Sequence, residues 1–302
     1  MSSGVGLLSL WDVPAPAKLN LFLHVTGRLH DGYHQLQSVF VLIDWADTLH
    51  FERRQDGRLV RHDLGASLPA DDLCLQAARS LQSASGCKLG VDLSIDKRVP
   101  SQAGLGGGSS DAATTLLALN RLWGLRWPRK RLLGLAASLG ADVPFFVGGD
   151  NAWVEGRGEA LTPIELPTQW FAVVKPDAGL STAAVFNHPA LVRDTPAAIL
   201  SGFLADAAPP GSGEDSGRSE GFGRNDLQPP AEACCPEVTA AAEWLEQHFG
   251  NSRMTGSGSA VFARNGTDDG PRVAWPAAAL PPGWVGRMCR SLAQHPLRDW
   301  AS

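Results

Sequence analysis

The sequence predicts a protein of the α/β or α+β class, because stretches with the apolar period of a strand alternate with stretches of helical periodicity. A second observation concerns size: 302 residues are more than one domain usually holds, which favours two domains. A third is a change of composition between Pro163 and Pro167. We therefore expect domains over residues 1–163 and 164–302.

The N-terminal half alternates strands with helices. Period-two alternation of apolar residues predicts strands over residues 17–28, 39–43, 48–51 and 91–100. Helical spacing predicts helices over residues 71–86, with an acidic first turn, and 109–123. Asp31 and Gly32 predict a turn, Gly86 is expected to end the first helix, and Pro100 is expected to stop the fourth strand.

The rest of the chain continues this alternation. The pattern over residues 128–164 predicts a helix, a turn that carries Asp142, and strands separated by glycines. Residues 170–176 predict a strand and residues 238–249 a helix, followed by a second glycine–serine turn in MTGSGSAVFA. Residues 206–224 contain almost no apolar side chains, so they are expected to form a mobile surface loop.

The composition is that of an ordinary soluble globular protein, with 44% hydrophobic and 19% charged residues. The net charge of −5 argues against a nucleic-acid partner, because a phosphate backbone requires a basic surface. Five cysteines without a C-x-x-C motif indicate reduced thiols rather than a disulfide framework. The sequence shows neither a signal peptide nor an apolar run of membrane-spanning length, so we expect a cytoplasmic protein with no membrane partner.

The stretch AGLGGGSS at residues 103–110 places four glycines and two serines before an apolar helix. It could bind an anion such as phosphate through free N–H groups at the helix N-terminus, or it could be an empty turn. Three consecutive glycines are entropically costly for capping alone, which favours the anion. Ser109 and Ser110 are expected to cap the helix and to offer hydroxyls to a phosphate. Ser109 breaks the G-x-G-x-x-G dinucleotide pattern, and no Gly-Lys pair supplies a Walker A motif, so a dehydrogenase is disfavoured.

The loop is part of a longer resemblance. PSQAGLGGGSSDAA resembles the P-x-x-x-G-L-G-S-S-A-A signature of the GHMP kinases, the family of galactokinase, homoserine kinase and mevalonate kinase. PAKLNLFLHVTGRLHDGYHQLQSVF, GADVPFFV, ALTPI, RNDLQPP and MTGSGSAVFA are similar, in this order, to the branch of that family that phosphorylates 4-diphosphocytidyl-2-C-methyl-D-erythritol. The resemblance extends from about residue 11 to residue 263.

This resemblance implies a two-domain α+β GHMP kinase fold. The N-terminal domain would resemble the second domain of ribosomal protein S5, the C-terminal domain would be ferredoxin-like, and the active site would lie in the cleft between them. The implied reaction transfers the γ-phosphoryl group of ATP to the 2-hydroxyl of that substrate in the non-mevalonate isoprenoid pathway. ATP and the cytidine-linked alcohol are then the partners, Mg²⁺ arrives with the nucleotide, no protein metal ligand is expected, and the chain would be a monomer or weak homodimer.

Two charged residues are the expected catalytic pair. Lys18 stands in the otherwise apolar strand PAKLNLFLHV, where an ammonium must either reach solvent or find an opposite charge. Asp142 stands in LGADVPFF, where a carboxylate flanked by apolar residues is either a turn residue or a functional group. The resemblance implies that Asp142 is the catalytic aspartate and that Lys18 pairs with it and activates the substrate hydroxyl.

The resemblance also assigns the ATP side of the site. Lys97 matches a position on the adenine side, although it could also be a solvated lysine at a strand end. Gln102 departs from the glycine that many GHMP kinases carry, which is expected to stiffen the loop slightly. The residues expected to hold the ATP phosphates are Pro100, Ser101, Gln102, Ala103, Gly104, Leu105, Gly106, Gly107, Gly108, Ser109 and Ser110.

The substrate side is assigned in the same way. Asn20 lies one strand period beyond Lys18 and should share its face. Tyr33 and Phe186 would stack on the cytosine, with plain core packing as the alternative. The expected substrate-binding residues are Asn20, Tyr33, His34, Thr182, Phe186, Gly256, Ser257 and Gly258, the last three also being compatible with an ordinary hairpin turn.

Two further functions stay open from the sequence. One is a GHMP-like protein that senses nucleotide without catalysis, which the presence of both Lys18 and Asp142 disfavours. The other is a kinase for a smaller alcohol such as mevalonate or homoserine. The motifs DGYHQL and STAAVF favour a cytidine, because the smaller substrates have no base to stack.

Overall fold

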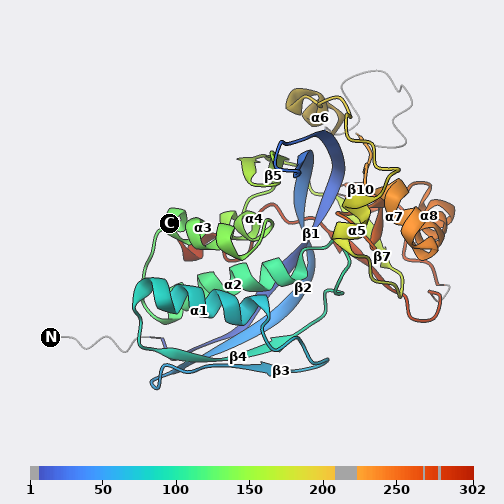
Figure 1. The fold of residues 1–302 in the computed structure, drawn as a ribbon. Helices are drawn as coiled ribbons and strands as arrows, with labels where there is room; N and C mark the ends of the chain where they lie inside the picture. The colour runs from blue at the N-terminus through green and yellow to red at the C-terminus, as the bar shows by residue number, and fades with distance from the viewer. Residues whose placement is uncertain (1–6, 208–222, 268, 278–279) are drawn as a thin grey trace.

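The computed structural model describes residues 7–207, 223–267, 269–277 and 280–302, and it contains two main sheets with helices packed on them, and a separate two-stranded sheet (Figure 1). The larger, six-stranded sheet has the order β3-β4-β2-β5-β6, and β1 pairs with β2. Its strands are β1 (Ser9–Arg28), β2 (His34–Arg54), β3 (Leu59–Asp63), β4 (Gly90–Asp96), β5 (Ala152–Glu155) and β6 (Ala160–Pro163).

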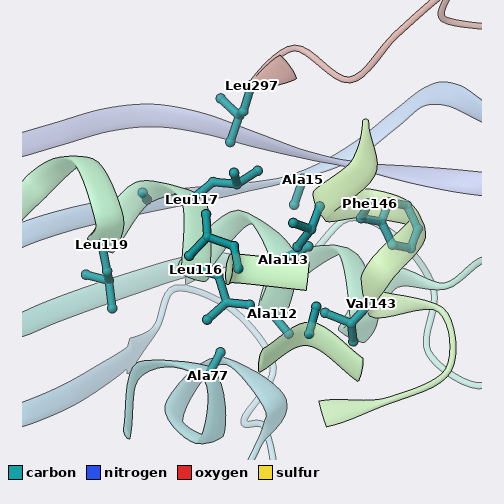
Figure 2. Packing of buried hydrophobic residues seen from close by; sticks show 14 of the residues in the cluster. Ala15, Ala77, Ala112, Ala113, Leu116, Leu117, Leu119, Val143, Phe146 and Leu297 are labelled. Carbon is teal, nitrogen blue, oxygen red and sulfur yellow. The ribbon is translucent and has the colours of Figure 1, made fainter. Parts of the chain in front are cut away.

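Four helices cover one face of this sheet: α1 (Leu73–Ser85), α2 (Gly107–Leu122), α3 (Arg129–Leu139) and α4 (Val143–Gly148). The helix α1 begins where the Asp72 carboxylate accepts the Leu75 N–H, and it ends at Gly86, whose φ of 67° is a left-handed conformation that glycine adopts readily. The helix α2 is almost wholly buried. Its leucines and alanines pack against α4 and the sheet (Figure 2).

The smaller sheet has the order β12-β7-β9-β8, and its strands are β7 (Trp170–Lys175), β8 (Arg253–Met254), β9 (Val261–Arg264) and β12 (Val285–Arg290). The other elements of this half are α5 (Thr182–Asn187), α6 (Leu200–Ala207), α7 (Gln228–Cys234), α8 (Pro236–Phe249), β10 (Gly266–Thr267), β11 (Gly270–Pro271) and the short helix η1 (Arg298–Trp300). The helices α7 and α8 share an apolar core with β7 and β9.

A separate apolar core joins the two sheets. Side chains of β1 and β2 meet Phe171 and Val173 of β7 and Phe262 of β9 there. The strand β1 supplies Leu19 and Leu21 to this core, so the intervening side chains point to its opposite face. This alternation places Lys18 and Asn20 side by side on the face of β1 that points away from this core, as the period of the sequence predicts.

Several predicted elements are confirmed, and others differ for local reasons. The helices at 71–86 and 238–249 and the strand at 170–176 are present, with ends shifted by a few residues. The strands predicted at 39–43 and 48–51 form the single strand β2, because it pairs along its length with β1. The strand predicted to run to Pro100 ends at Asp96.

The last residues of the chain return to the half that contains the larger sheet. Leu297 and Ala301 pack in the core around α2, although they follow the last strand of the smaller sheet (Figure 2). Division of the chain at residue 163 stays a prediction. Of the predicted loop at 206–224, residues 208–222 lie outside the described residues, while 206 and 207 end α6. Within the described chain, no helix combines the length and apolar character needed to span a membrane.

Candidate active site

A cavity of about 880 Å³ lies where the β1–β2 hairpin, the glycine loop before α2, the start of α4 and the glycine turn before β9 come together. Many of the residues predicted from the sequence line it. They are Lys18, Asn20, Tyr33, His34, Gln102, Gly104, Gly106, Ser109, Asp142, Thr182, Phe186, Gly256, Ser257 and Gly258.

The other predicted residues of the ATP loop lie beside the cavity rather than on its wall. Ala103 and Leu105 are buried in the core between the sheets, so their side chains anchor the loop. The predicted residues outside the cavity lining are Lys97, Pro100, Ser101, Ala103, Leu105, Gly107, Gly108 and Ser110. The glycine loop therefore presents alternate residues to the cavity and to the core.

Lys18 and Asp142 face each other in the cavity. The Lys18 ammonium lies 3.5 Å from the Asp142 carboxylate, and the two side chains are 4% and 30% exposed. Asp142 occupies the residue before α4, and its side chain caps no N–H of that helix. Its carboxylate is therefore not consumed by helix capping and remains accessible to a ligand.

The Lys18 side chain is held on three sides. Its ammonium donates to the Asn20 Oδ1 at 2.6 Å and lies 4.6 Å from the centre of the Phe40 ring. The Asn20 amide in turn donates to the Ser38 hydroxyl at 2.9 Å, and the Asn20 N–H donates to the Thr255 hydroxyl at 2.9 Å. Asn20 is thus buried and acts as the support of the ammonium in this structure.

The glycine loop is bonded to both halves of the molecule. The Lys18 N–H donates to the Leu105 carbonyl at 2.9 Å, and the Ala260 N–H donates to the Ala103 carbonyl at 3.1 Å. Gly104 lies so close to the second glycine turn that a Cβ there would meet the Thr255 carbonyl at 2.1 Å. Glycine is required at this position because the two backbones touch.

Gln102 has a φ of 51°, in the left-handed region that side chains other than glycine adopt at a cost. Its side chain packs closely on Gly179, where a Cβ would meet the Gln102 amide oxygen at 2.0 Å. Glycine adopts such a left-handed backbone readily, and contact with the second half of the chain holds the glutamine here.

The start of α2 differs from the prediction. The helix begins at Gly107 rather than at Ser109, and its N-cap is Gly106 with a φ of 70° and no side-chain cap. Ser109 and Ser110 are therefore not caps, because they lie within the first turn. The Ser110 hydroxyl is buried without a hydrogen-bond partner among the described residues, while Ser109 lines the cavity.

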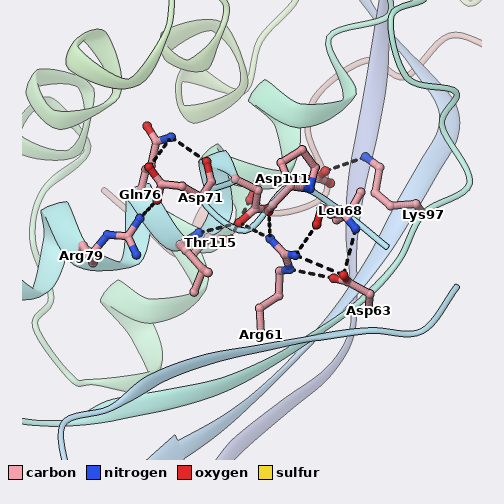
Figure 3. A network of polar contacts seen from close by, with 12 residues as sticks. Arg61, Asp63, Leu68, Asp71, Gln76, Arg79, Lys97, Asp111 and Thr115 are labelled. Carbon is pink, nitrogen blue, oxygen red and sulfur yellow. Dashed lines mark hydrogen bonds and ion pairs between the residues drawn. The ribbon is translucent and has the colours of Figure 1, made fainter. Parts of the chain in front are cut away.

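Lys97 is enclosed beside this first turn. Its ammonium binds the Asp47 carboxylate. It also lies 2.6 Å from the carboxylate of Asp111 (Figure 3). Asp47 also accepts the N–H groups of Arg98 and Val99 at 2.6 and 2.7 Å. These two residues therefore bond to a side chain and do not continue strand β4. Burial alone would lower the pKa of Lys97, but the two carboxylates outweigh it and raise that pKa. Burial raises the pKa of Asp111 well above its ordinary value.

The far end of the cavity is aromatic. Tyr33 is 60% exposed, and the His34 ring lies 5.1 Å from the Phe186 ring, centre to centre. Burial, together with the positive charges of Arg193 and Arg28, lowers the pKa of His34, and Arg193 donates to its Nε2 at 3.1 Å. A neutral imidazole with an occupied Nε2 leaves Nδ1 for a ligand.

Thr182 and Ser257 connect α5 to the second glycine turn. Their hydroxyl oxygens lie 2.8 Å apart, although they are 75 residues apart in the chain. Both line the cavity, as do the backbone atoms of Gly256 and Gly258. The predicted substrate residues are thereby brought to one wall.

Sequence reasoning missed several residues of the cavity. Arg28, Asp31 and Arg157 line it beside Tyr33, and Ser38 and Phe40 line it beside Lys18. Ser38 and Phe40 follow the same period-two rule that placed Asn20, so the facing strand offered a usable signal. Arg157 offered none, because its turn lies 126 residues from the aspartate that it binds.

Two family models match the chain: the N-terminal domain of GHMP kinases matches residues 72–150, and the C-terminal domain of GHMP kinases matches residues 208–273. A 4-diphosphocytidyl-2-C-methyl-D-erythritol kinase from Methylibium petroleiphilum is 65% identical over 98% of this chain and 100% of its own length. A protein with the same name from Variovorax paradoxus is 56% identical over 97% and 99%.

Comparison with solved structures points to the same family and fold. A crystal structure of a 4-(cytidine 5'-diphospho)-2C-methyl-D-erythritol kinase has a TM-score of 0.72 and 33% identity, covering 87% of this chain and 91% of that one. A homoserine kinase from Cytophaga hutchinsonii shares the fold, with a TM-score of 0.62 and 14% identity over 98% and 97% of the two chains. The two-domain α+β GHMP fold expected from the sequence is confirmed. The chain therefore belongs to the GHMP kinase family and, within it, to the 4-diphosphocytidyl-2-C-methyl-D-erythritol kinases.

Proposed function

We propose that the chain transfers the γ-phosphoryl group of ATP to the 2-hydroxyl of 4-diphosphocytidyl-2-C-methyl-D-erythritol, giving the 2-phosphate and ADP. Family membership makes the chain an ATP-using kinase of the non-mevalonate isoprenoid pathway. The observation that carries the assignment of the site is the Lys18–Asp142 pair, 3.5 Å apart, on the wall of the same cavity as the glycine loop.

Phosphoryl transfer requires an aligned hydroxyl, a group to take its proton, and neutralisation of charge on the phosphates. Asp142 suits the second task, because its carboxylate is partly exposed and Lys18 is its one ion-pair partner within the described residues. Lys18 suits the first and third tasks, because Asn20 and Phe40 fix its ammonium at the cavity wall. The N–H groups at the start of α2 supply further positive potential for the phosphates.

Mg²⁺ is proposed as the partner of the nucleotide. Among the described residues, no group of three or more His, Cys, Asp and Glu side chains is placed to hold a metal ion. Mg²⁺ commonly binds through phosphates, waters and one or two protein oxygens. The hydroxyl of Ser109, on the cavity wall, fits this donor set, and so does that of the neighbouring Ser110, which is buried and has no partner among the described residues. When bound, the ion would neutralise charge on the ATP phosphates.

The aromatic end of the cavity is proposed to hold the cytidine. Tyr33 and Phe186 offer ring faces for a base, and neutral His34 offers a hydrogen bond from Nδ1. A cavity of about 880 Å³ is large enough for a nucleotide-linked alcohol beside the triphosphate end of ATP. Thr182 and the second glycine turn complete the wall between the two ends.

The reaction is proposed to take place in the cytoplasm on a monomer or weak homodimer. The five cysteines are unpaired, which is typical of proteins in reducing compartments. Side chains of one chain supply both the charged and the aromatic end of the cavity, so the proposed chemistry needs no second subunit.

ADP release with three alcohols tests the proposed substrate. The purified chain, ATP and Mg²⁺ are supplied in parallel with 4-diphosphocytidyl-2-C-methyl-D-erythritol, mevalonate or homoserine. We expect at least about a hundredfold higher kcat/KM for the cytidine-linked alcohol, because only that substrate can use the aromatic end of the cavity. Equal or better turnover of mevalonate or homoserine would contradict the proposal, and ATP hydrolysis without any acceptor is the control.

A further inference from the structure

Asp31 lies at the tip of the turn that carries Tyr33. Its Oδ1 accepts the Tyr33 N–H at 3.2 Å, and the turn is closed by the Leu29 N–H, which donates to the Tyr33 carbonyl at 2.7 Å. Gly32, with a φ of 88°, allows this tight turn. The backbone of Tyr33 is therefore fixed, while its side chain stays 60% exposed.

Arg157 reaches the same turn from the hairpin between β5 and β6. Its guanidinium donates to Asp31 Oδ2 and lies over the Tyr33 ring, with Cζ 4.5 Å from the ring centre. The Arg157 hairpin is itself anchored, because the Gly156 carbonyl accepts the Leu36 N–H at 2.6 Å. One carboxylate thus holds both the Tyr33 backbone and the cation that covers its ring.

This cluster is poorly explained as a stabilising feature. The side chains of Arg157 and Asp31 are 45% and 47% exposed, and exposed ion pairs add little to the free energy of unfolding. All three residues line the cavity, at the end where His34 and Phe186 lie. The contact of Arg157 with Asp31 and Tyr33 would therefore matter for the binding of a base.

We propose that Arg157, held by Asp31, is a positioning residue that orders the Tyr33 ring before the cytosine arrives. This inference rests on the proposed function, in which Tyr33 stacks on the base. Arg157 covers one face of the ring, so the base would stack on the opposite face. A ring already ordered loses less rotational freedom on binding, which favours the complex about two- to tenfold.

Arg157→Ala tests this with steady-state kinetics. We expect KM for the cytidine-linked alcohol to rise about two- to tenfold, with kcat and KM for ATP changed less than twofold, because the residue acts only on the base. Arg79→Ala is the matched control. It removes a similarly exposed Arg–Asp pair, between Arg79 on helix α1 and Asp71 just before that helix (Figure 3). An unchanged or lower KM in Arg157→Ala would overturn the proposal.

A double-mutant cycle separates positioning from direct contact. If Arg157 acts through Tyr33, the substitution Arg157→Ala should have no further effect on KM in a Tyr33→Ala background. A full additional loss in that background would mean that the guanidinium touches the substrate itself, for example its diphosphate, and would overturn the positioning role.

Tyr33 is the only tyrosine in the chain, so a ring-labelled tyrosine gives one set of NMR signals. Without ligand, Arg157→Ala should shift these signals and Arg79→Ala should not. Added CDP should shift them in both proteins, with weaker affinity in Arg157→Ala. If CDP shifts the signals but binds both proteins equally, the inference fails and the proposed function stands. If CDP shifts neither, the proposed role of Tyr33 fails, and the inference fails with it.

Discussion

Two lysines lie beside the glycine loop, Lys18 buried and Lys97 half-buried, and both meet aspartates, yet their surroundings are opposite. Lys18 faces one carboxylate at 3.5 Å, and that carboxylate is 30% exposed on the cavity wall. Lys97 faces two carboxylates, from Asp47 and Asp111, whose side chains are 0% and 4% exposed. The first pair is open to a ligand, and the second is closed.

The difference shows how one pair of residue types serves two purposes. A charge whose bonding partners all belong to the protein holds the surrounding backbone in place. Asp47 binds Lys97 and accepts two backbone N–H groups, and it thereby fixes the segment that leads into the glycine loop. A charge that is only partly satisfied keeps capacity for a substrate. We therefore expect substitutions at the open pair to reduce catalysis and substitutions at the closed pair to reduce stability.

The largest expected effect is on turnover at the open pair. Asp142→Ala should lower kcat about 10²–10⁴-fold, which is the usual loss when a general base is removed. The urea midpoint should stay nearly constant, because Asp142 caps no helix and is partly exposed. Turnover and unfolding are measured on the same preparation. A kcat close to that of the unaltered chain would remove Asp142 from the mechanism.

The next effect is on the free energy of unfolding. Lys97→Met should cost about 3–5 kcal/mol, because it leaves the buried charge of Asp47 without its cation. Lys18→Met is the matched comparison and should cost less than about 1 kcal/mol, since water can reach Asp142. Urea unfolding of both variants measures this. Equal losses would show that the two pairs do not differ in the way described.

The smallest effect concerns pH. The pKa of Asp111 is raised in the folded chain, so its contribution to stability is present below its ordinary pKa of 3.8 and is lost as the pH rises through the folded-state value. Asp111→Asn cannot titrate and resembles the protonated acid. Its free energy of unfolding, relative to the unaltered chain, should increase with pH by at most about 1.4 kcal/mol per unit. A difference independent of pH would contradict the raised pKa.

The resemblance to GHMP kinases pointed to the open pair of Lys18 and Asp142, whereas nothing in the sequence pointed to the partners of Lys97. Period-two alternation added only that Lys18 and Asn20 share one face of β1, and the structure joins them at 2.6 Å. The partners of Lys97 lie 50 and 14 residues away, in elements whose contact depends on the whole sheet. Local patterns therefore indicated an ordinary strand end there.

The same limit applies to the fold and to the aromatic end of the cavity. Helix caps such as Gly86 are local and were predictable, whereas the start of α2 depends on packing of Gly106 against Lys18 and Phe146. Tyr33 was found through its motif, but Arg157 reaches it through the pairing of two hairpins. Contacts between distant turns are set by tertiary structure, which a single sequence does not display.

The most direct test of the open pair is a crystal structure with a non-hydrolysable ATP analogue and the cytidine-linked alcohol. We expect the acceptor hydroxyl within about 2.6–3.2 Å of the Asp142 carboxylate, with the γ-phosphate between Lys18 and the N–H groups at the start of α2. A hydroxyl beyond hydrogen-bond reach of both Lys18 and Asp142, or a triphosphate bound away from the glycine loop, would contradict the account.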